Sequence, residues 1–167
     1  MRVLEVFEAH QTAYYVKEYL DEGSLAESLA HRSHFCTEET LFFVQRICAA
    51  LDVLHQNKMQ HLDLKPSNIL LGGVEQVVLT DFGLSKHRLS DGMLEASTDI
   101  GRGASDYAPL EQGLCGDDDV FRPTIDVYSL GAILYQLLTG LAPLDALHIL
   151  NEGFNMELFK RRGGGNV

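Results

Sequence analysis

The stretch IDVYSLGAILYQLLTG, residues 125–140, constrains the fold more than any other part of the sequence. Apolar residues occupy nearly every side of a helix drawn through it, so this helix is expected to lie inside a core. Gly140 and Pro143 follow as termination signals. Such a helix needs apolar elements around it. A chain of 167 residues, 46% of them hydrophobic, is long enough to supply them within one domain.

A second helix is predicted over residues 36–57, CTEETLFFVQRICAALDVLHQN. Thr37 is the expected N-cap, and Glu38 and Glu39 suit the positive end of the helix dipole. The apolar positions recur at helical spacing and form one stripe of Leu41, Val44, Ile47, Cys48, Leu51 and Leu54. We therefore expect this helix to be well buried, with Cys48 as a small core residue.

The β elements and a short helix are predicted from local signals. Residues 2–8 and 12–20 are rich in β-branched and aromatic residues, so they are expected to pair as strands around a turn. Ser24 and Glu27 have the spacing of a capping box, which predicts that a short helix follows.

Further along the chain, the apolar runs 68–71 and 76–80 are expected to form a β-hairpin. Residues 84–106 are polar and without period, which predicts a long loop. The order of elements predicts the α+β class, a mostly helical domain with small β elements.

Charge and cysteine content exclude several functions. The net charge of -11 and a single compact basic run at 160–162 argue against nucleic acid as a partner. The three cysteines share no CxxC spacing, so a disulfide framework or a zinc site is not expected. Glu5 and Glu8 interrupt any signal-peptide core, and no apolar run reaches the roughly 20 residues that span a bilayer. These features favour a cytoplasmic location with no membrane segment in the chain.

The segment HLDLKPSNIL, residues 61–70, places Asp63, Lys65 and Asn68 within six residues. The predicted hairpin brings Asp81 back beside them. Phosphoryl transfer requires such a set: one carboxylate to accept a proton from the attacking hydroxyl, oxygen ligands for Mg²⁺, and a cation near the transferred group. Taken alone, the segment is equally compatible with an ordinary polar turn.

At this point the sequence resembles the eukaryotic-type Ser/Thr protein kinases, in a bacterial-like version. Five motifs carry the resemblance in the family's order: YYVKEYLDEGSL as the hinge, HLDLKPSN as the catalytic loop, TDFGLSK as the metal-binding segment, YAPLEQ as the end of the activation segment, and DVYSLGAILYQLLTG as the central helix. It implies a partial kinase domain over 1–160, with remnant small-lobe strands and the hinge in 1–20, the large lobe in 21–160, and a frayed tail at 161–167.

The resemblance also implies ATP and Mg²⁺ as cofactors and a protein with Ser or Thr as the substrate. Asp63 is then the catalytic base, and Lys65 contacts the transferring phosphate. Asn68 and Asp81 are the implied Mg²⁺ ligands.

For the nucleotide, the resemblance implies that the backbone of Glu18 and Leu20 binds the adenine edge and that Leu70 forms the floor of its pocket. Lys17, just before Glu18, occupies a position that is usually apolar in the family. It either reaches solvent or points inward and partly replaces the family's strand lysine.

Three more residues receive supporting roles from the resemblance. His61 and Asp126 are expected to brace the catalytic loop from behind, and Glu111 to anchor the activation segment. Taken singly, Asp126 is equally compatible with a helix cap and Glu111 with a surface carboxylate. Three other histidines receive no role and are interpreted as solvent-facing or loop residues: His55, His87 and His148.

The sequence departs from the family pattern at several points. Leu62 stands where many of these kinases have an arginine that reads an activation-loop phosphate, so that switch is not expected here. Ala104 replaces a usual threonine, and Pro109 and Leu110 displace the usual Ala-Pro-Glu. Substrate docking is the function that these changes affect. A chain with these ends is also expected to lack most of the small lobe and the last helices of the large lobe.

These observations leave three functions to compare. The first is a Ser/Thr protein kinase, represented by a fragment that is expected to bind ATP weakly or not at all by itself. The second is a non-catalytic, pseudokinase-like scaffold or relic, and the third a small-molecule phosphotransferase, which Lys65 and Asp81 argue against. We also expect an exposed apolar face where the small lobe packs, and association through it.

Overall fold

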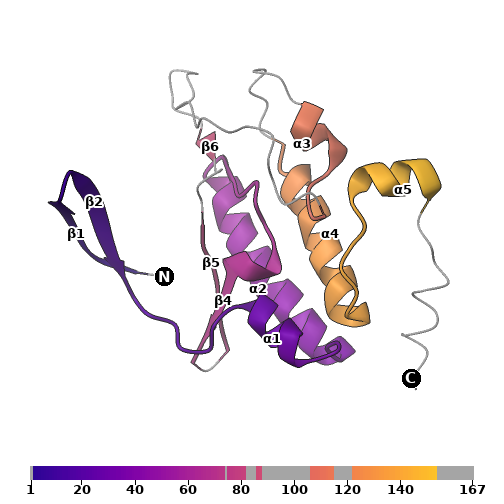
Figure 1. Cartoon of the computed structure of the whole chain (residues 1–167), viewed down its shortest axis with the longest axis horizontal. Helices are drawn as coiled ribbons and strands as arrows, with labels where there is room; N and C mark the ends of the chain where they lie inside the picture. Colours follow the sequence, from indigo (N-terminus) through magenta and orange to yellow (C-terminus); the bar gives the residue numbers. More distant parts are fainter. Residues whose placement is uncertain (1, 74, 82–85, 88–105, 115–121, 154–167) are drawn as a thin grey trace.

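The computed structural model describes residues 2–73, 75–81, 86–87, 106–114 and 122–153 of the chain. Five helices, one 3₁₀ turn and three pairs of antiparallel strands occur in these ranges, which confirms the predicted α+β class (Figure 1). In chain order they are β1 (Val3–Ala9), β2 (Thr12–Lys17), α1 (Leu25–His31), α2 (Thr37–Gln56), β3 (Met59–Gln60), η1 (Pro66–Asn68), β4 (Ile69–Gly72), β5 (Gln76–Leu79), β6 (Lys86–His87), α3 (Leu110–Leu114), α4 (Thr124–Thr139) and α5 (Ala146–Glu152). None of the described helices combines the length and the apolarity needed to cross a bilayer.

The β1–β2 hairpin confirms the predicted N-terminal strand pair. Its turn residues His10 and Gln11 both have positive φ angles, 51° and 60°, as a tight two-residue hairpin turn requires. Figure 1 shows the hairpin standing apart from the helical body, joined to it by an extended stretch. Its large apolar side chains are accordingly exposed: Val3, Leu4, Val6, Phe7, Tyr14, Tyr15 and Val16. These exposed side chains lie on both sides of the hairpin. The apolar face expected where the small lobe packs, and association through it, stay predictions.

Helix α1 begins with the predicted capping box. The Ser24 N–H donates to the Glu27 carboxylate at 2.8 Å, and the Ser24 hydroxyl accepts from the Glu27 N–H at 3.2 Å. These two bonds satisfy donors that every helix N-terminus leaves open.

Helix α2 is capped by Cys36, so the prediction of Thr37 as its N-cap is wrong. Cys36 has the extended backbone of an N-cap residue, and its sulfur accepts from the Glu39 N–H at 3.5 Å while the Glu39 carboxylate accepts from the Cys36 N–H at 3.1 Å. Thr37 is the first residue of the helix itself. A sulfur atom fills the role that an oxygen usually has, which propensity rules do not anticipate.

The core lies where α2 and α4 pack against each other and against the β4–β5 hairpin (Figure 1). Ile47 and Leu51 of α2 and Ile133 and Leu137 of α4 are 4% exposed or less. Cys48 is exposed, so the prediction that it is a core residue is wrong. The buried line of α2 runs through Ile47 and Leu51, and Cys48 lies beside this line rather than on it.

The β4–β5 hairpin confirms the prediction for the two short apolar runs after the HLDLKPSN loop. Ile69 pairs with Leu79 and Gly72 with Gln76, in antiparallel register. The predicted long loop over 84–106 is corrected at its start, because Lys86–His87 forms strand β6 beside β3. A two-residue strand carries no detectable period, and both β3 and β6 therefore escaped prediction. The rest of that loop lies outside the described residues.

Gly140 ends α4 as predicted, and replacing it is expected to destabilise the domain. It adopts φ +69°, and a Cβ built on it lies 1.6 Å from the Ser33 carbonyl oxygen. Gly140→Ala should therefore lower the free energy of unfolding by about 2 kcal/mol, from the left-handed conformation and the displaced backbone together. Urea unfolding followed by circular dichroism measures this change.

The matched control is Gly131→Ala in the same helix, where a Cβ meets nothing within 4 Å. That change should be neutral or stabilise by roughly 0.5–1 kcal/mol, because alanine is the better helix former. Equal stability of the two variants would contradict the assigned role of Gly140.

Candidate active site

The loop between β3 and β4 is held in place by apolar residues on either side of its polar ones. Leu64 and Ile69 are buried in the core, 1% and 0% exposed. Between them Pro66 starts the single 3₁₀ turn η1, closed by the Asn68 N–H donating to the Lys65 carbonyl at 2.9 Å. Proline suits this first position because it needs no hydrogen-bond donor there. The loop is thus anchored in the core by Leu64 and Ile69.

Three predicted catalytic residues meet within this loop. The Lys65 ammonium lies 2.8 Å from Asp63 Oδ2, and the side-chain amide of Asn68 donates to the same oxygen at 3.0 Å and to the Asp63 carbonyl at 2.8 Å. The side chain of Asp63 is only 11% exposed, so these charge-assisted bonds act with limited screening by water. The simple polar-turn interpretation does not explain why one carboxylate oxygen collects two donors.

Asp81 follows strand β5, and its approach to the loop is set by Thr80. The Thr80 N–H donates to the Asn68 carbonyl at 2.9 Å, and the Thr80 carbonyl accepts from His61 Nε2 at 3.1 Å. Asp81, the next residue, therefore follows the end of the hairpin at the position where Thr80 pairs with Asn68. Asp81 is exposed and adopts φ +61°, a conformation uncommon for residues other than glycine.

The donor set at this corner fits a hard cation such as Mg²⁺. The NH₂ group of Asn68 is engaged by Asp63, so the amide oxygen is the atom that remains for a cation, and Asp81 adds a carboxylate. Mg²⁺ prefers a few protein oxygens and keeps several waters. Within the described ranges no group of three or more His, Cys, Asp or Glu is arranged to hold a metal, so a larger protein cage of those residues is not present there.

Asp126 braces the loop from behind, as predicted together with His61. Its side chain is 0% exposed, and its two oxygens accept from the backbone N–H groups of His61 and Leu62, each at 3.0 Å. It lies within the first turn of α4, whose N-cap is Pro123, so the helix-cap interpretation of Asp126 is wrong. A buried carboxylate needs such donors, because leaving it without them is strongly destabilising.

His55 supplies the remaining bond to Asp126, so the interpretation that His55 is a solvent-facing residue without a role is wrong. Its Nε2 lies 2.8 Å from Asp126 Oδ2, and its side chain is 19% exposed. The signal was present in the sequence, because His55 follows Ile47 and Leu51 at helical spacing and shares their buried line on α2.

Burial keeps the imidazole of His61 neutral. Desolvation lowers its pKa below the ordinary 6.5, more than the charges of Asp126 and Asp63 raise it. The hydrogen bonds agree, since Nε2 donates to the Thr80 carbonyl and Nδ1 accepts from the Asp63 N–H at 3.4 Å. This tautomer places the one ring proton on the side of the hairpin.

Acid is expected to destabilise the domain through His61. The unfolded chain takes up a proton near pH 6.5, whereas the folded chain resists it, so the unfolded state binds more protons as the pH falls below that value. The free energy of unfolding should therefore decrease between pH 7.5 and 5.5. In urea unfolding at both pH values, His61→Gln should show the smaller decrease, because glutamine does not titrate. All other residues are the same in the two proteins, so the difference isolates His61, and equal decreases would exclude this role.

The predicted nucleotide-binding residues are distributed over two places. Leu20 packs against Gly72 at the end of strand β4. Leu70 lies on the same strand, where it pairs with Val78 of β5 and forms a β-bridge to Ser24. The extended stretch 18–24 therefore runs along β4 on its way from the hairpin. These contacts bring Leu20 and Leu70 onto neighbouring backbone segments.

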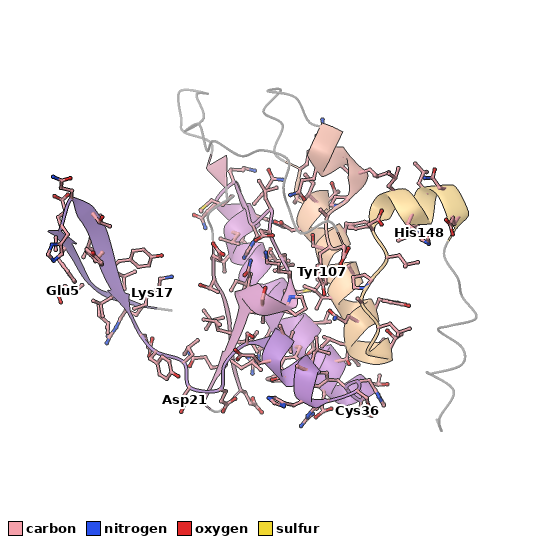
Figure 2. All side chains as sticks on the ribbon, in the orientation of Figure 1. Glu5, Lys17, Asp21, Cys36, Tyr107 and His148 are labelled. Atoms are coloured by element: carbon pink, nitrogen blue, oxygen red, sulfur yellow. The ribbon has the colours of Figure 1, made fainter. Side chains whose placement is uncertain are left out.

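Glu18 lies at the base of the β1–β2 hairpin and is exposed. Its N–H donates to the Arg2 carbonyl at 2.9 Å. Lys17 lies at the same base (Figure 2), and its ammonium is 4.6 Å from the centroid of the Tyr15 ring. The Lys17 ammonium thus makes a cation–π contact with the Tyr15 ring two residues before it. Among the described residues, no contact joins Lys17 to Asp81.

The segment 106–112, called here the docked segment, lies against α4 and the loop. The Ser129 hydroxyl donates to the Tyr107 carbonyl at 2.8 Å, and the Tyr107 hydroxyl donates to Gln136. Gln112 donates its side-chain amide to the Leu62 carbonyl at 2.7 Å. Gln112 was missed from the sequence, where a glutamine after an acidic residue gives no signal of burial.

The anchoring role that the resemblance implied for Glu111 stays a prediction. The side chain of Glu111 is exposed, and none of the ion pairs found among the described residues includes it. The contacts that attach the segment come from Tyr107 and Gln112. Several predicted features lie outside the described residues, namely Phe82 and Gly83 of the metal-binding segment, Ala104, and the tail 161–167.

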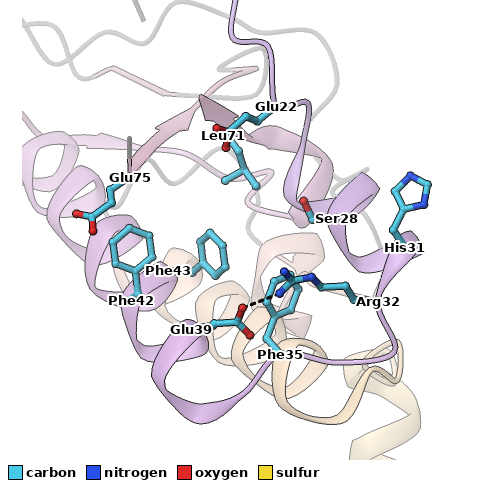
Figure 3. A pocket seen from close by; sticks show the side chains of 10 residues that line it. All are labelled: Glu22, Ser28, His31, Arg32, Phe35, Glu39, Phe42, Phe43, Leu71 and Glu75. Atoms are coloured by element: carbon cyan, nitrogen blue, oxygen red, sulfur yellow. Dashed lines mark hydrogen bonds and ion pairs between the residues drawn. The ribbon is translucent and has the colours of Figure 1, made fainter. Parts of the chain in front are cut away.

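Two cavities differ in their relation to the loop. A cavity of about 140 Å³ adjoins the loop at Lys65, Pro66 and Ser67, and Tyr107 and Gln136 also line it. A cavity of about 500 Å³ lies elsewhere, between α1, α2 and strand β4, and none of the predicted site residues lines it (Figure 3). The smaller cavity is therefore the one that belongs to the candidate site.

A helical body that presents an aspartate, a lysine and an asparagine on one short loop, with a second aspartate delivered by a hairpin, has the architecture of a phosphotransferase domain. The family model for the protein kinase domain matches residues 1–160, and the chain therefore belongs to the protein kinase family. Several of the relatives that it matches are named serine/threonine protein kinases.

A probable serine/threonine-protein kinase of Dictyostelium discoideum is 34% identical over 145 residues, which are 87% of this chain and 17% of that protein. The carbon catabolite-derepressing protein kinase of Secale cereale is 35% identical over 165 residues, 99% of this chain and 30% of that kinase. The SNF1-related protein kinase catalytic subunit alpha KIN12 of Arabidopsis thaliana is 32% identical over 151 residues, 90% of this chain and 29% of that subunit. The chain thus spans less than a third of the length of these relatives.

Proposed function

We propose that this chain carries the catalytic loop of a protein Ser/Thr kinase, which transfers a phosphoryl group to a hydroxyl of a protein substrate. The observation that supports this most strongly is the shared use of Asp63 Oδ2 by Lys65 and Asn68, with Asp81 delivered beside them by strand β5. The match of a protein kinase model to residues 1–160 supports the same assignment.

Each residue has a distinct role in this proposal. Asp63 orients the substrate hydroxyl and accepts its proton, as a general base must lie within hydrogen-bond reach of the proton it takes. Lys65 offsets the charge that develops near the reacting hydroxyl. Asn68 and Asp81 hold Mg²⁺ through oxygen atoms. ATP and Mg²⁺ supply the phosphoryl group and neutralise its charge when they are bound.

For the nucleotide, we propose the backbone of Glu18 and Leu20 as the adenine edge and Leu70 as the floor. The packing of Leu20 beside strand β4 supports this placement. In this view residues 1–20 are small-lobe strands and hinge, residues 21–160 are the large lobe, and 161–167 a tail. We place the protein in the cytoplasm, since the cysteines at 36 and 48 are free thiols.

A transfer assay tests the proposal. The purified chain, with Mg²⁺ and γ-labelled ATP, is incubated with dephosphorylated casein as a mixed Ser/Thr acceptor, and the labelled amino acid is identified after hydrolysis. Label on serine or threonine that disappears in Asp63→Asn supports a Ser/Thr kinase. Label that persists in the variant points to a contaminating kinase. If no label appears with the full chain, the proposed transfer activity fails for this chain, and the scaffold alternative is favoured.

The alternative function is a non-catalytic, pseudokinase-like scaffold, and the exposed β1–β2 hairpin favours it. Apolar side chains on both of its faces provide a surface for association with a protein partner. Sedimentation velocity of the chain and of Val6→Lys distinguishes the cases. A concentration-dependent mass that the variant loses supports association through the hairpin, whereas a monomer in both proteins removes that support.

A further inference from the structure

The peptide group that precedes Asp63 is held in an unusual conformation. Leu62 has φ +64°, a left-handed value that is strained for a branched apolar residue. Its N–H donates to Asp126, which fixes one side of the residue. Its carbonyl belongs to the Leu62–Asp63 peptide plane. A hydrogen bond to that carbonyl oxygen therefore also orients the backbone of Asp63.

Gln112 is the side chain that holds this oxygen. Its amide nitrogen lies 2.7 Å from the Leu62 carbonyl, 50 positions away in the sequence. The N–H of the same peptide plane has the longer contact, 3.4 Å to His61 Nδ1. The short bond from Gln112 is therefore the stronger constraint on the plane.

The burial of Gln112 indicates that this orientation is enforced. Its residue is 9% exposed, and its amide oxygen is a buried atom without a hydrogen-bond partner among the described residues. Leaving an amide oxygen unsatisfied is unfavourable. A flipped amide would however place that oxygen against the Leu62 carbonyl, acceptor against acceptor, so the donor must face the loop.

The docked segment that carries Gln112 is itself attached at its other end. Tyr107 is bonded through its carbonyl to Ser129 and through its hydroxyl to Gln136, both on α4. A displacement of this segment would thus be transmitted to the Leu62 carbonyl through one side chain. Leu62 itself has no charge or donor beyond its backbone with which to contact the segment.

We propose that Gln112 is a positioning residue that couples the docked segment to Asp63 through the Leu62–Asp63 peptide, without any charge on the segment. The proposal deepens the proposed kinase function and rests on it. The link between the docked segment and the loop is then the uncharged side-chain amide of Gln112. Asp63 is therefore oriented whenever residues 106–112 are docked.

The activity test uses the full chain and three variants. Gln112→Met keeps the length of the side chain and removes the donor, and Gln112→His restores a donor on a ring nitrogen. Gln45→Met, on the exposed side of α2, is the matched control. Gln112→Met should lower kcat about tenfold with the KM for Mg²⁺-ATP within about twofold, because small misplacement of a catalytic group is costly. Gln112→His should recover most of kcat, and Gln45→Met should match wild type.

A wild-type kcat in Gln112→Met, or an equal loss of kcat in Gln112→His, would overturn the positioning role. A purely structural role would lower the amount of folded enzyme and not separate kcat from KM. The rescue variant distinguishes the two explanations.

Nuclear magnetic resonance tests the link independently of catalysis and in the unaltered protein. The side-chain NH₂ of Gln112 should exchange slowly with solvent and show a through-hydrogen-bond coupling to the Leu62 carbonyl. Fast exchange without coupling would refute the link. If the chain transfers no phosphate while the coupling is present, the kinase proposal fails and the link between segment and loop stands.

Discussion

Asp63→Asn is expected to reduce phosphoryl transfer by about 10²–10⁴-fold, the range typical for removal of a general base. The substitution keeps the shape of the side chain but replaces an acceptor of protons by an amide. It also removes the charge that Lys65 contacts at 2.8 Å, so the ammonium is left to reorient. The initial rate of label transfer from γ-labelled ATP to casein, at saturating Mg²⁺, measures the effect.

The control for this prediction is Asp52→Asn, an exposed carboxylate on α2 that accepts a hydrogen bond from Gln56 of the same helix. It should transfer phosphate at the wild-type rate. Circular dichroism must show that Asp63→Asn is folded, since its loop neighbours Leu64 and Ile69 are core residues. A folded Asp63→Asn protein that retains more than about a tenth of the rate would exclude Asp63 as the base.

Asp126→Asn is expected to give the largest loss of stability, about 3 kcal/mol, because a buried network loses an acceptor and gains a mismatched donor. The carboxylate accepts from the N–H groups of His61 and Leu62 and from His55, and an amide NH₂ would face one of those donors. For a domain of this size the midpoint of thermal unfolding should fall by roughly 6–12 °C. Differential scanning calorimetry measures this shift.

Asp52→Asn again provides the comparison, with an expected change below about 0.5 kcal/mol because the site is solvent-exposed. His55→Gln should be intermediate, since Asp126 then loses one donor but keeps both backbone N–H groups. If Asp126→Asn unfolds at the same midpoint temperature as the wild type, the carboxylate does not stabilise the left-handed turn at Leu62.

Features that depend on neighbours in the sequence were predicted well. The capping box of Ser24 and Glu27 and the β4–β5 hairpin were expected from spacing and turn chemistry, and both are present. The meeting of Asp63 with Asn68 is of the same kind, because a proline-started turn between them returns the chain within five residues. Local geometry alone is sufficient for such contacts.

Predictions that required knowing which helix faces which were less successful. Cys48 was assigned to the core because an apolar stripe has no sharp edge in a sequence, and the packing of α2 on α4 placed that edge beside Ile47. His55 was interpreted as solvent-facing, although it lies on the buried line of the same helix. The helical spacing indicates the buried position of His55, but only the tertiary structure supplies its partner, Asp126.

The sequence by itself determined the two long helices, the β1–β2 and β4–β5 hairpins, the loop with its acidic, basic and amide side chains, and the family to which these belong. Only the tertiary structure decided what holds the loop in place: His55 reaches Asp126 across 71 positions, and Gln112 reaches Leu62 across 50. The physical reason is that periodicity and turn chemistry act over a few residues. A hydrogen bond between distant segments exists only after the core has brought α2, α4 and the docked segment together.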